Sequence, residues 1–178
     1  MKYMVTGGNR GLGLALCKHF GADSYSRGTG YDITKDIDAI AKISTDYDVV
    51  IIQKKTSLNA VELFLIRKFS HKIIYDFDDA TMFHELEHRK PLIGKNFKKF
   101  LNTINIADIV VAGNDFLASF CKSNVGDVYK LPTPVNTDKY FPLKKEDKRI
   151  VSLGWIGVPG SIGHLEKLLP ILKNLSKY

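Results

Sequence analysis

The chain has 178 residues and a net charge of +7, and 44% of its residues are hydrophobic against 25% charged. These values are ordinary for a soluble globular protein of one domain, or of one domain and a fragment. The two cysteines, Cys17 and Cys121, form neither a disulfide framework nor a pair with metal-ligand spacing. A reducing, cytoplasmic setting is therefore expected. No apolar run reaches the roughly 18 residues that a membrane-spanning helix needs, and the N-terminal MKYMVTGG is not a signal peptide.

Up to residue 75, short apolar runs alternate with segments of helical spacing. The apolar runs predict strands at residues 2–6, 23–26, 48–52 and 72–75, and the i, i+4 spacing predicts helices at residues 11–20, 32–43 and 58–69. The run at 48–52 shows no polar alternation, which is typical of a strand covered on both faces.

The second half continues the alternation after an irregular stretch at residues 76–94. Helices are predicted at residues 96–106 and 114–121, the latter with Asn114 as N-cap, and strands at 108–112 and 127–131. A Pro-rich connector at 132–148 leads to a strand at 149–155, a turn at 157–160 and a helix at 162–175 interrupted at Pro170.

This order predicts an α/β fold: a Rossmann-like parallel sheet with helices on both faces, plus a truncated βα unit of a second lobe. The domains expected are residues 1–131, a linker at 132–148, and the incomplete start of a second lobe at 149–178. Ligands of such sheets bind at the carboxyl ends of the strands, so the residues that follow each strand are the candidates for a site.

The first candidate follows the first strand, where Thr6-Gly7-Gly8-Asn9-Arg10-Gly11-Leu12-Gly13 would bring a pyrophosphate close to a helix N-terminus. This resembles the T-G-x-x-x-G-x-G fingerprint of short-chain dehydrogenases/reductases over about residues 1–50. The resemblance implies NADP as cofactor, because Arg27 after the second strand suits a 2′-phosphate and Asp32-Ile33 matches a pair that contacts adenine. The implied cofactor-binding residues are Thr6, Gly7, Asn9, Arg10, Gly11, Leu12, Gly13, Arg27, Asp32 and Ile33.

The catalytic residues of that family are missing from this sequence. Its chemistry needs a helical Tyr-x-x-x-Lys pair, and the one such spacing here, Tyr140 to Lys144, contains Pro142, which prevents a continuous helix. This half of the sequence predicts a cofactor-binding module without dehydrogenase catalysis.

From residue 47 to the end, the chain resembles GT-B glycosyltransferases that use nucleotide-sugar donors. The matching segments are DVVIIQKK, KIIYDFDDA, ADIVVAGNDFLASF, PTPVNTDKYFP and the GWIG turn at residues 154–157. The resemblance implies that Asp76, Asp78 and Asp79 face the catalytic cleft and hold the acceptor hydroxyl. It also implies that Gly154, Trp155 and Gly157 approach the donor phosphates. The basic pair and the paired glutamates with which that family grips the donor are absent, so this chain alone forms an incomplete donor site.

A third pattern, His84-Glu85-Leu86-Glu87-His88, satisfies H-E-x-x-H. No convincing third ligand follows it and Glu87 stands where such sites favour apolar packing, so no metal site is predicted.

The leading interpretation is a GT-B glycosyltransferase-like protein that acts on a nucleotide-sugar donor. The alternatives are an NADP-binding module and an inactive chimeric or truncated fragment. The two resemblances meet near residues 48–52, a buried strand in both families. The expected partner is a small-molecule nucleotide. The positive charge leaves peripheral membrane contact open, no nucleic-acid motif is present, and the sequence leaves the oligomeric state open.

Overall fold

A computed structural model of the chain describes residues 1–6, 11–25, 45–54, 56, 58–83, 94–123, 125–142, 153–157 and 159–175. The chain divides into two compact units, Met1–Val135 and Asn136–Tyr178. The first unit contains the sheet and the helices that cover it. The predicted helix at residues 32–43 and the H-E-x-x-H pattern lie outside the described residues.

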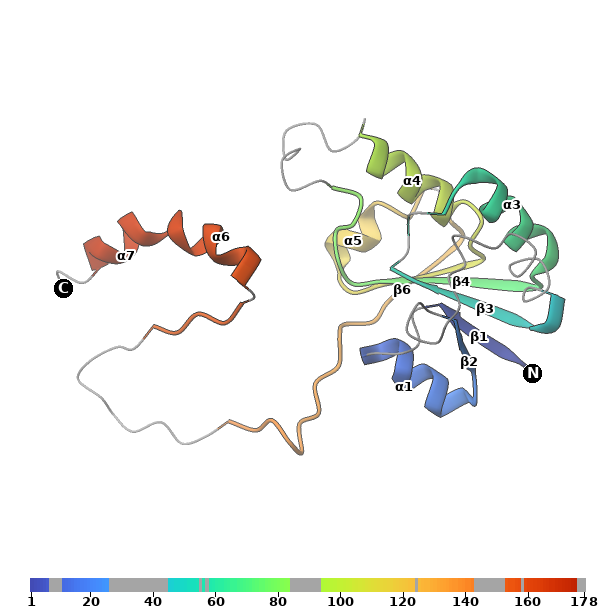
Figure 1. The fold of residues 1–178 in the computed structure, drawn as a ribbon, viewed down its shortest axis with the longest axis horizontal. Coiled ribbons are helices and arrows are strands. Elements are labelled where there is room, and N and C mark those ends of the chain that lie inside the picture. Colours follow the sequence, from blue (N-terminus) through green and yellow to red (C-terminus); the bar gives the residue numbers. More distant parts are fainter. Residues whose placement is uncertain are drawn as a thin grey trace. The chain divides into compact units, whose positions relative to one another are not determined.

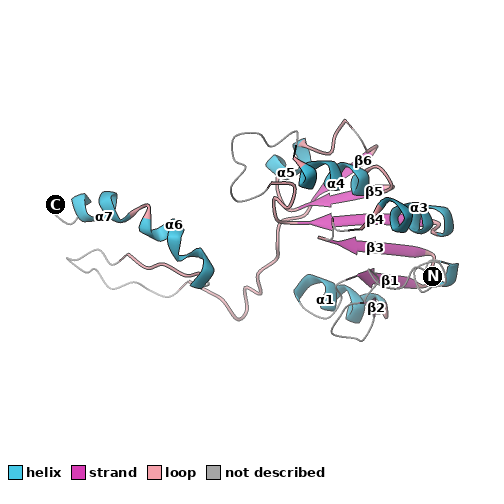
Figure 2. Ribbon diagram, turned by 45° about the horizontal axis from the view of Figure 1, so that its top comes forward, coloured by secondary structure: helices cyan, strands magenta, loops and turns pink. Residues whose placement is uncertain are grey.

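The first unit is built on one parallel sheet of six strands in the order β2-β1-β3-β4-β5-β6 (Figures 1 and 2). Every neighbouring pair is parallel. The strands are β1 (Tyr3–Thr6), β2 (Asp23–Tyr25), β3 (Val49–Gln53), β4 (Lys72–Phe77), β5 (Ile109–Ala112) and β6 (Asp127–Lys130). The predicted α/β, Rossmann-like fold is confirmed.

Helices cover both faces of this sheet. α1 (Gly11–Phe20) lies on one face, and α3 (Ala60–Phe69), α4 (Lys95–Ile104) and α5 (Asp115–Ser119) lie on the other (Figure 1). Right-handed crossovers require this division, because the chain moves from β1 outward to β2 but from β3 in the opposite direction to β4 and β5.

Side chains alternate between two hydrophobic cores along the central strands. Val50 and Ile52 of β3 join Tyr75 and Phe77 of β4 in the larger core, which the apolar sides of α3, α4 and α5 complete. The intervening β3 residues, Val49 and Ile51, pack toward α1 in the smaller core. Both faces of β3 are therefore buried, which explains its unbroken VVII sequence.

β3 is also the place where the two sequence resemblances meet. It pairs in parallel with β1, in the register Val5↔Ile51, and with β4, in the register Ile51↔Ile74. The sheet is therefore continuous across this junction.

Two helices begin at asparagine N-caps. Asn59 and Glu62 form a capping box, in which the Asn59 side chain accepts from the Glu62 N–H at 3.0 Å and Glu62 accepts from the Asn59 N–H at 2.6 Å. This cap starts α3 at Ala60, two residues later than the prediction from apolar spacing. The predicted cap at Asn114 is confirmed, since its side chain accepts from the Leu117 N–H at 2.9 Å.

The second unit contains a short 3₁₀ helix (Pro159–Ser161), α6 (Ile162–Glu166) and α7 (Leu169–Leu175). The helix predicted at residues 162–175 with an interruption at Pro170 is divided into α6 and α7, and the break lies before the proline. Pro170 lacks an N–H and its ring would clash with the Glu166 carbonyl, so the helix ends one turn before the proline. Residues 153–157 form no strand, and the described part of this unit offers them no strand to pair with.

The order of the strands locates the expected binding edge. β2 is added to one side of β1, whereas β3 and the later strands are added to the other side. The order of the strands therefore reverses between β1 and β3. In open parallel sheets, ligands bind outside the carboxyl ends of the strands at such a reversal. Here those ends are Thr6 of β1 and Gln53 of β3, and Gln53 in turn lies beside Asp76 near the end of β4.

Candidate functional site

Three of the predicted site residues lie together at the carboxyl edge of the sheet. Asp76 is the last but one residue of β4 and pairs in register with Gln53 at the end of β3. Asp78 and Asp79 follow β4 directly. The structure therefore brings the acidic loop to the edge where the direction of the sheet reverses.

Asp76 is the buried member of this group. It is 9% exposed, and the Gln53 side-chain amide donates to its Oδ2 at 3.2 Å. Burial raises the pKa of Asp76 above its ordinary value, and the Gln53 hydrogen bond opposes this effect. Asp76 alternates with Tyr75 and Phe77 of the larger core, so it lies on the face of the sheet that α1 covers.

Lys54 is a functional candidate that the sequence reasoning missed. Its ammonium contacts the carboxylate of Asp78 and lies 3.1 Å from Oδ2 of Asp79. The hydrogen bond to Asp78 is the main cause of a raised pKa for Lys54, so this side chain keeps its charge. Lysine directly after a buried strand, in the segment QKK, is the signal that could have identified it.

The backbone of Lys54 is held in an unusual conformation. Its φ is 55°, in the left-handed region that non-glycine residues rarely adopt, at a cost of roughly 1–2 kcal/mol. The Lys54 N–H donates to the Asp76 carbonyl at 2.7 Å, which fixes this turn against the end of β4. The turn aims the side chain at the acidic loop instead of along the strand.

Asp78 is held from two further sides. The Thr133 hydroxyl donates to its Oδ2 at 3.2 Å, which ties the connector after β6 to the acidic loop. Gly113, after β5, donates its N–H to the Phe77 carbonyl at 3.0 Å, and a Cβ on Gly113 would come within 3.0 Å of Cα and Cβ of Asp78. A side chain at Gly113 would therefore force the acidic loop or the end of β5 to shift by a few tenths of an ångström.

The three carboxylates differ in their access to solvent. The Asp79 side chain is 70% exposed and that of Asp78 is 32% exposed, whereas Asp76 is buried. Lys54 neutralises part of the charge of the two outer carboxylates. Asp79 is thus the carboxylate that a ligand can reach most readily.

The predicted dinucleotide residues are only partly described. Thr6 ends β1, and Gly11, Leu12 and Gly13 form the first turn of α1. The remaining residues of that prediction lie outside the described residues: Gly7, Asn9, Arg10, Arg27, Asp32 and Ile33. The described backbone has a strand before the glycine-rich segment and a helix after it, as a pyrophosphate-binding turn requires.

The predicted donor-phosphate residues belong to the second unit. Gly154, Trp155 and Gly157 lie in a segment without regular secondary structure. The Trp155 ring packs over Gly157, where it would collide with any added Cβ, and Trp155 itself is 42% exposed.

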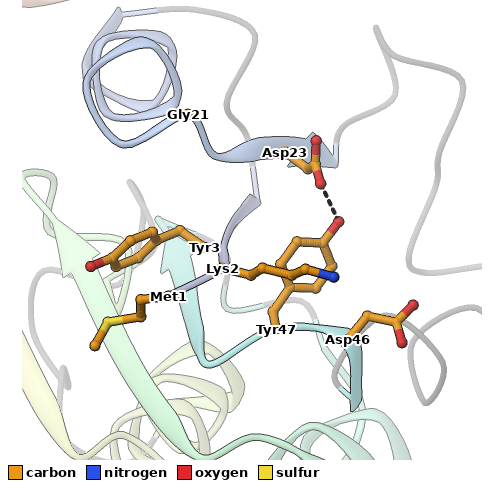
Figure 3. A pocket seen from close by; sticks show the side chains of 7 residues that line it. All are labelled: Met1, Lys2, Tyr3, Gly21, Asp23, Asp46 and Tyr47. Atoms are coloured by element: carbon orange, nitrogen blue, oxygen red, sulfur yellow. Dashed lines mark hydrogen bonds between the residues drawn. The ribbon is translucent and has the colours of Figure 1, made fainter.

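A pocket of about 260 Å³ lies at the opposite edge, beside the amino ends of β1 and β2 (Figure 3). The Tyr47 hydroxyl donates to Asp23 across one side of it. It is lined by Met1, Lys2, Tyr3, Gly21, Asp23, Asp46 and Tyr47. Since it lies at the amino ends of the strands, away from the reversal between β1 and β3, we do not assign it to the candidate site.

Within the described ranges, no cluster of three His, Cys, Asp or Glu side chains could hold a metal ion. In the same ranges, no helix has the length and apolar character needed to cross a membrane. Burial raises the pKa of the Cys121 thiol to about 11, so this cysteine is a poor nucleophile at neutral pH.

Comparison with models of known protein families finds no match to this chain, and a search of curated proteins finds no match either.

Proposed function

We propose that this chain binds a nucleotide-sugar at the carboxyl edge of its sheet and takes part in glycosyl transfer. The observation that carries the proposal is the cluster of Lys54, Asp78 and Asp79, which occupies the ends of β3 and β4 next to the reversal of the sheet. Ligands of open parallel sheets gather at this edge. The resemblance of residues 47–178 to GT-B glycosyltransferases supports the choice of ligand.

The proposed reaction needs one group to receive a proton. The oxygen of an acceptor hydroxyl forms a bond to the anomeric carbon, and the bond from that carbon to the nucleoside diphosphate breaks. The diphosphate leaves with the electron pair, and the hydroxyl proton passes to a carboxylate. We assign this role to Asp79, because it is the most exposed of the three carboxylates.

The other members of the cluster position Asp79. Lys54 contacts both outer carboxylates, so it holds Asp79 beside Asp78 at the end of β4. Thr133 and Lys54 together hold Asp78. Asp76, buried and bonded to Gln53, supports the end of β4 and has no access to an acceptor.

NADP binding is the second candidate. The observation in its favour is that β1 ends at Thr6, next to the reversal of the sheet, and α1 begins five residues later at Gly11, with the glycine-rich sequence between them. Free N–H groups at a helix start can bind a pyrophosphate. The chain lacks the tyrosine–lysine pair for hydride chemistry, so binding without catalysis is the expected outcome.

Ligand-induced stabilisation separates the candidates. A ligand at about 100 times its Kd stabilises the folded state by about 2.7 kcal/mol, which raises the Tm by roughly 5–10 °C for a protein of this size. We expect uridine or guanosine diphosphate to give such a shift. A shift with NADPH alone, accompanied by a change in nicotinamide fluorescence, would favour the second candidate, and no shift with any of these ligands would overturn both.

The role of Asp79 has its own test. With a nucleotide-sugar and water as acceptor, release of nucleoside diphosphate should fall about 100-fold or more in Asp79→Asn, while the diphosphate still raises the Tm. Asp115→Asn is the matched control, because Asp115 is an exposed aspartate of α5 with a lysine partner. Equal release by wild type and Asp79→Asn would remove Asp79 from the reaction.

A further inference from the structure

The outward face of α3 and α4 combines exposed apolar side chains with lysines. Val61 and Phe64 of α3 are 55% and 61% exposed. The two helices pack against each other on one face of the sheet (Figures 1 and 2). We define the α3–α4 surface by six residues, of which Lys99 is half-buried and the others are exposed: Val61, Phe64, Lys68, Lys95, Lys98 and Lys99.

Helical periodicity places these side chains away from the sheet. In α3, Leu63 and Ile66 are buried in the larger core, so Val61 and Phe64 project from the other side of the helix. In α4, the buried residues are Phe97, Phe100, Thr103 and Ile104, and the lysines occupy the opposite side. The exposure of Val61 and Phe64 is therefore not needed for the packing of the core.

Among the residues that the structure describes, the carboxylates of α3 and α4 and the one just beyond α4 are already paired. Glu62 is the one carboxylate in the sequences of α3 and α4, and it is 3% exposed inside the capping box of α3. Asp108, beyond the end of α4, is paired with Arg67. The α3–α4 surface thus presents lysines without an exposed carboxylate on either helix.

We propose that the α3–α4 surface docks onto an anionic lipid membrane. Lysines beside exposed apolar side chains are the combination that anchors proteins at the membrane interface, because the apolar groups enter the headgroup region while the cations bind acidic lipids. The site in question is separate from the carboxyl edge of the sheet, so this inference does not depend on the proposed function.

Two other occupants fit the surface less well. A second copy of the chain would bring its own lysines against these lysines, and like charges oppose such an interface. A single-stranded nucleic acid can bind lysines and stack on an aromatic ring, but Val61 offers no face for stacking. A membrane uses both the apolar and the cationic residues.

The strength of binding should follow the number of lysines and the presence of Phe64. Each lysine near an anionic surface changes the partition coefficient about fivefold. We expect Lys68→Gln/Lys95→Gln/Lys98→Gln to weaken binding about 100-fold, and Phe64→Asn to weaken it about tenfold.

Flotation of the full-length chain with vesicles of phosphatidylcholine containing about 30% phosphatidylserine tests the proposal, with pure phosphatidylcholine vesicles as reference. The matched charge control is Lys18→Gln/Lys122→Gln/Lys139→Gln, which removes the same charge from exposed lysines elsewhere. The matched apolar control is Phe141→Asn, since Phe141 is 63% exposed on the connector. Circular dichroism at 222 nm verifies that each variant is folded.

The proposal predicts that the protein binds the anionic vesicles only and that this binding is lost when the salt is raised to about 1 M. Both α3–α4 variants should bind the vesicles more weakly, and both control variants should bind them as the wild type does. Equal loss in the charge control, or no loss in Phe64→Asn, would overturn it in favour of attachment by net charge. Binding of a single-stranded oligonucleotide without binding of vesicles would overturn it in favour of nucleic acid. A dimer that the Phe64→Asn change dissociates, without vesicle binding, would assign the surface to a second copy.

Discussion

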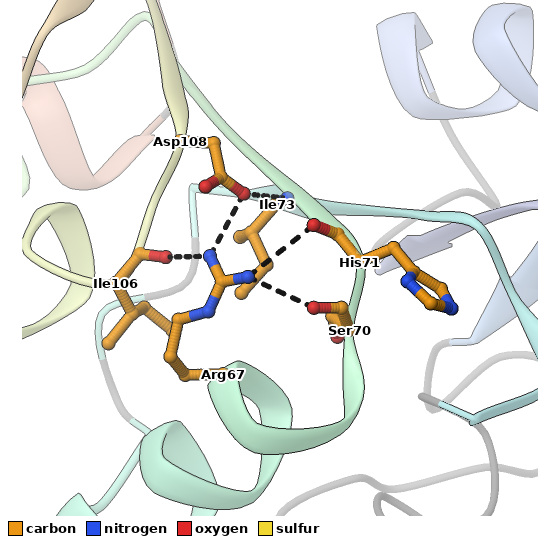
Figure 4. A network of polar contacts seen from close by, with 6 residues as sticks. All are labelled: Arg67, Ser70, His71, Ile73, Ile106 and Asp108. Carbon is orange, nitrogen blue, oxygen red and sulfur yellow. Dashed lines mark hydrogen bonds and ion pairs between the residues drawn. The ribbon is translucent and has the colours of Figure 1, made fainter.

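Arg67 of α3 and Asp108, the residue before β5, form an ion pair of 2.9 Å that joins segments 41 residues apart (Figure 4). The same guanidinium donates to the carbonyls of Ile106 at 3.1 Å and Ser70 at 3.0 Å. Asp108 in turn accepts from the Ile73 N–H at 2.7 Å. One side-chain pair therefore satisfies backbone groups at the end of α3, the start of β4 and the turn before β5.

Arg67→Lys should destabilise the protein although it conserves the charge. An ammonium cannot reproduce the planar fork that reaches Asp108 and the carbonyls of Ser70, His71 and Ile106, so these carbonyls lose their donor. The two side chains are 37% and 30% exposed, which limits the expected loss to about 1–2 kcal/mol. Urea unfolding at pH 7 measures this loss of stability.

The control is Lys130→Gln, which breaks the more exposed ion pair with Asp115 and should cost less than about 0.5 kcal/mol. If both variants lost the same stability, the Arg67 fork would have no special role.

Asp108 should make stability depend on acid pH. Burial by itself would raise the pKa of Asp108, but the Ile73 N–H and the Arg67 guanidinium outweigh it and hold the pKa below its ordinary value. Because the pKa of Asp108 is lower in the folded state than in the unfolded chain, its carboxylate stabilises the fold at pH values above the unfolded-state pKa of about 3.9. This stabilisation is lost as the pH falls through the folded-state pKa.

The stability difference between wild type and Asp108→Asn should therefore be constant from about pH 5 to 8 and shrink below about pH 4. Urea unfolding of both proteins across this range measures the difference. A difference that widens on acidification would mean that Asp108 is protonated more readily in the folded state than in the unfolded chain.

The sequence predicted the fold well because local patterns determined it. The unbroken apolar run of β3 reports burial on both faces, and Asn114 before an apolar helix reports a cap; neither signal depends on distant residues. The break between α6 and α7 was placed at Pro170, whereas the helix ends at Glu166, because a proline disturbs the turn that precedes it.

The candidate site was predicted only in part, since its geometry depends on contacts between strands. The acidic loop could be placed at the end of β4 from the sequence alone. The sequence also places Lys54 directly after β3, but its contacts with Asp78 and Asp79 could not be predicted, because they depend on a left-handed backbone and on the register that sets Gln53 beside Asp76. Thr133 lies 55 residues from Asp78, and nothing in the spacing of the sequence indicates that pair.

Asn114 should act in stability and not in ligand binding, although it follows a strand at the carboxyl edge. Its side chain is occupied by the Leu117 N–H. Asn114→Ala should cost about 1 kcal/mol in urea unfolding, whereas Asn114→Ser should retain most of the stability because serine also caps helices. Both variants should keep the Tm shift produced by nucleoside diphosphate; loss of that shift in a folded Asn114→Ser protein would give Asn114 a part in binding.

Gly113→Ala should disturb the acidic loop more than any other alanine change at a described glycine of the sheet unit. A methyl group there would meet Cα and Cβ of Asp78 at 3.0 Å, and the backbone of the loop cannot give way as a flexible side chain would. We expect the free energy of unfolding to fall by about 1–3 kcal/mol.

Gly126→Ala is the matched control, because nothing lies within 4 Å of its added Cβ and its φ is not positive. This variant should be neutral or slightly stabilising. If the proposed site is correct, Gly113→Ala should also weaken the Tm shift with nucleoside diphosphate, because displacing Asp78 moves Lys54, the cation that contacts both outer carboxylates. A destabilised Gly113→Ala protein with an unchanged ligand shift would separate the packing of this loop from binding.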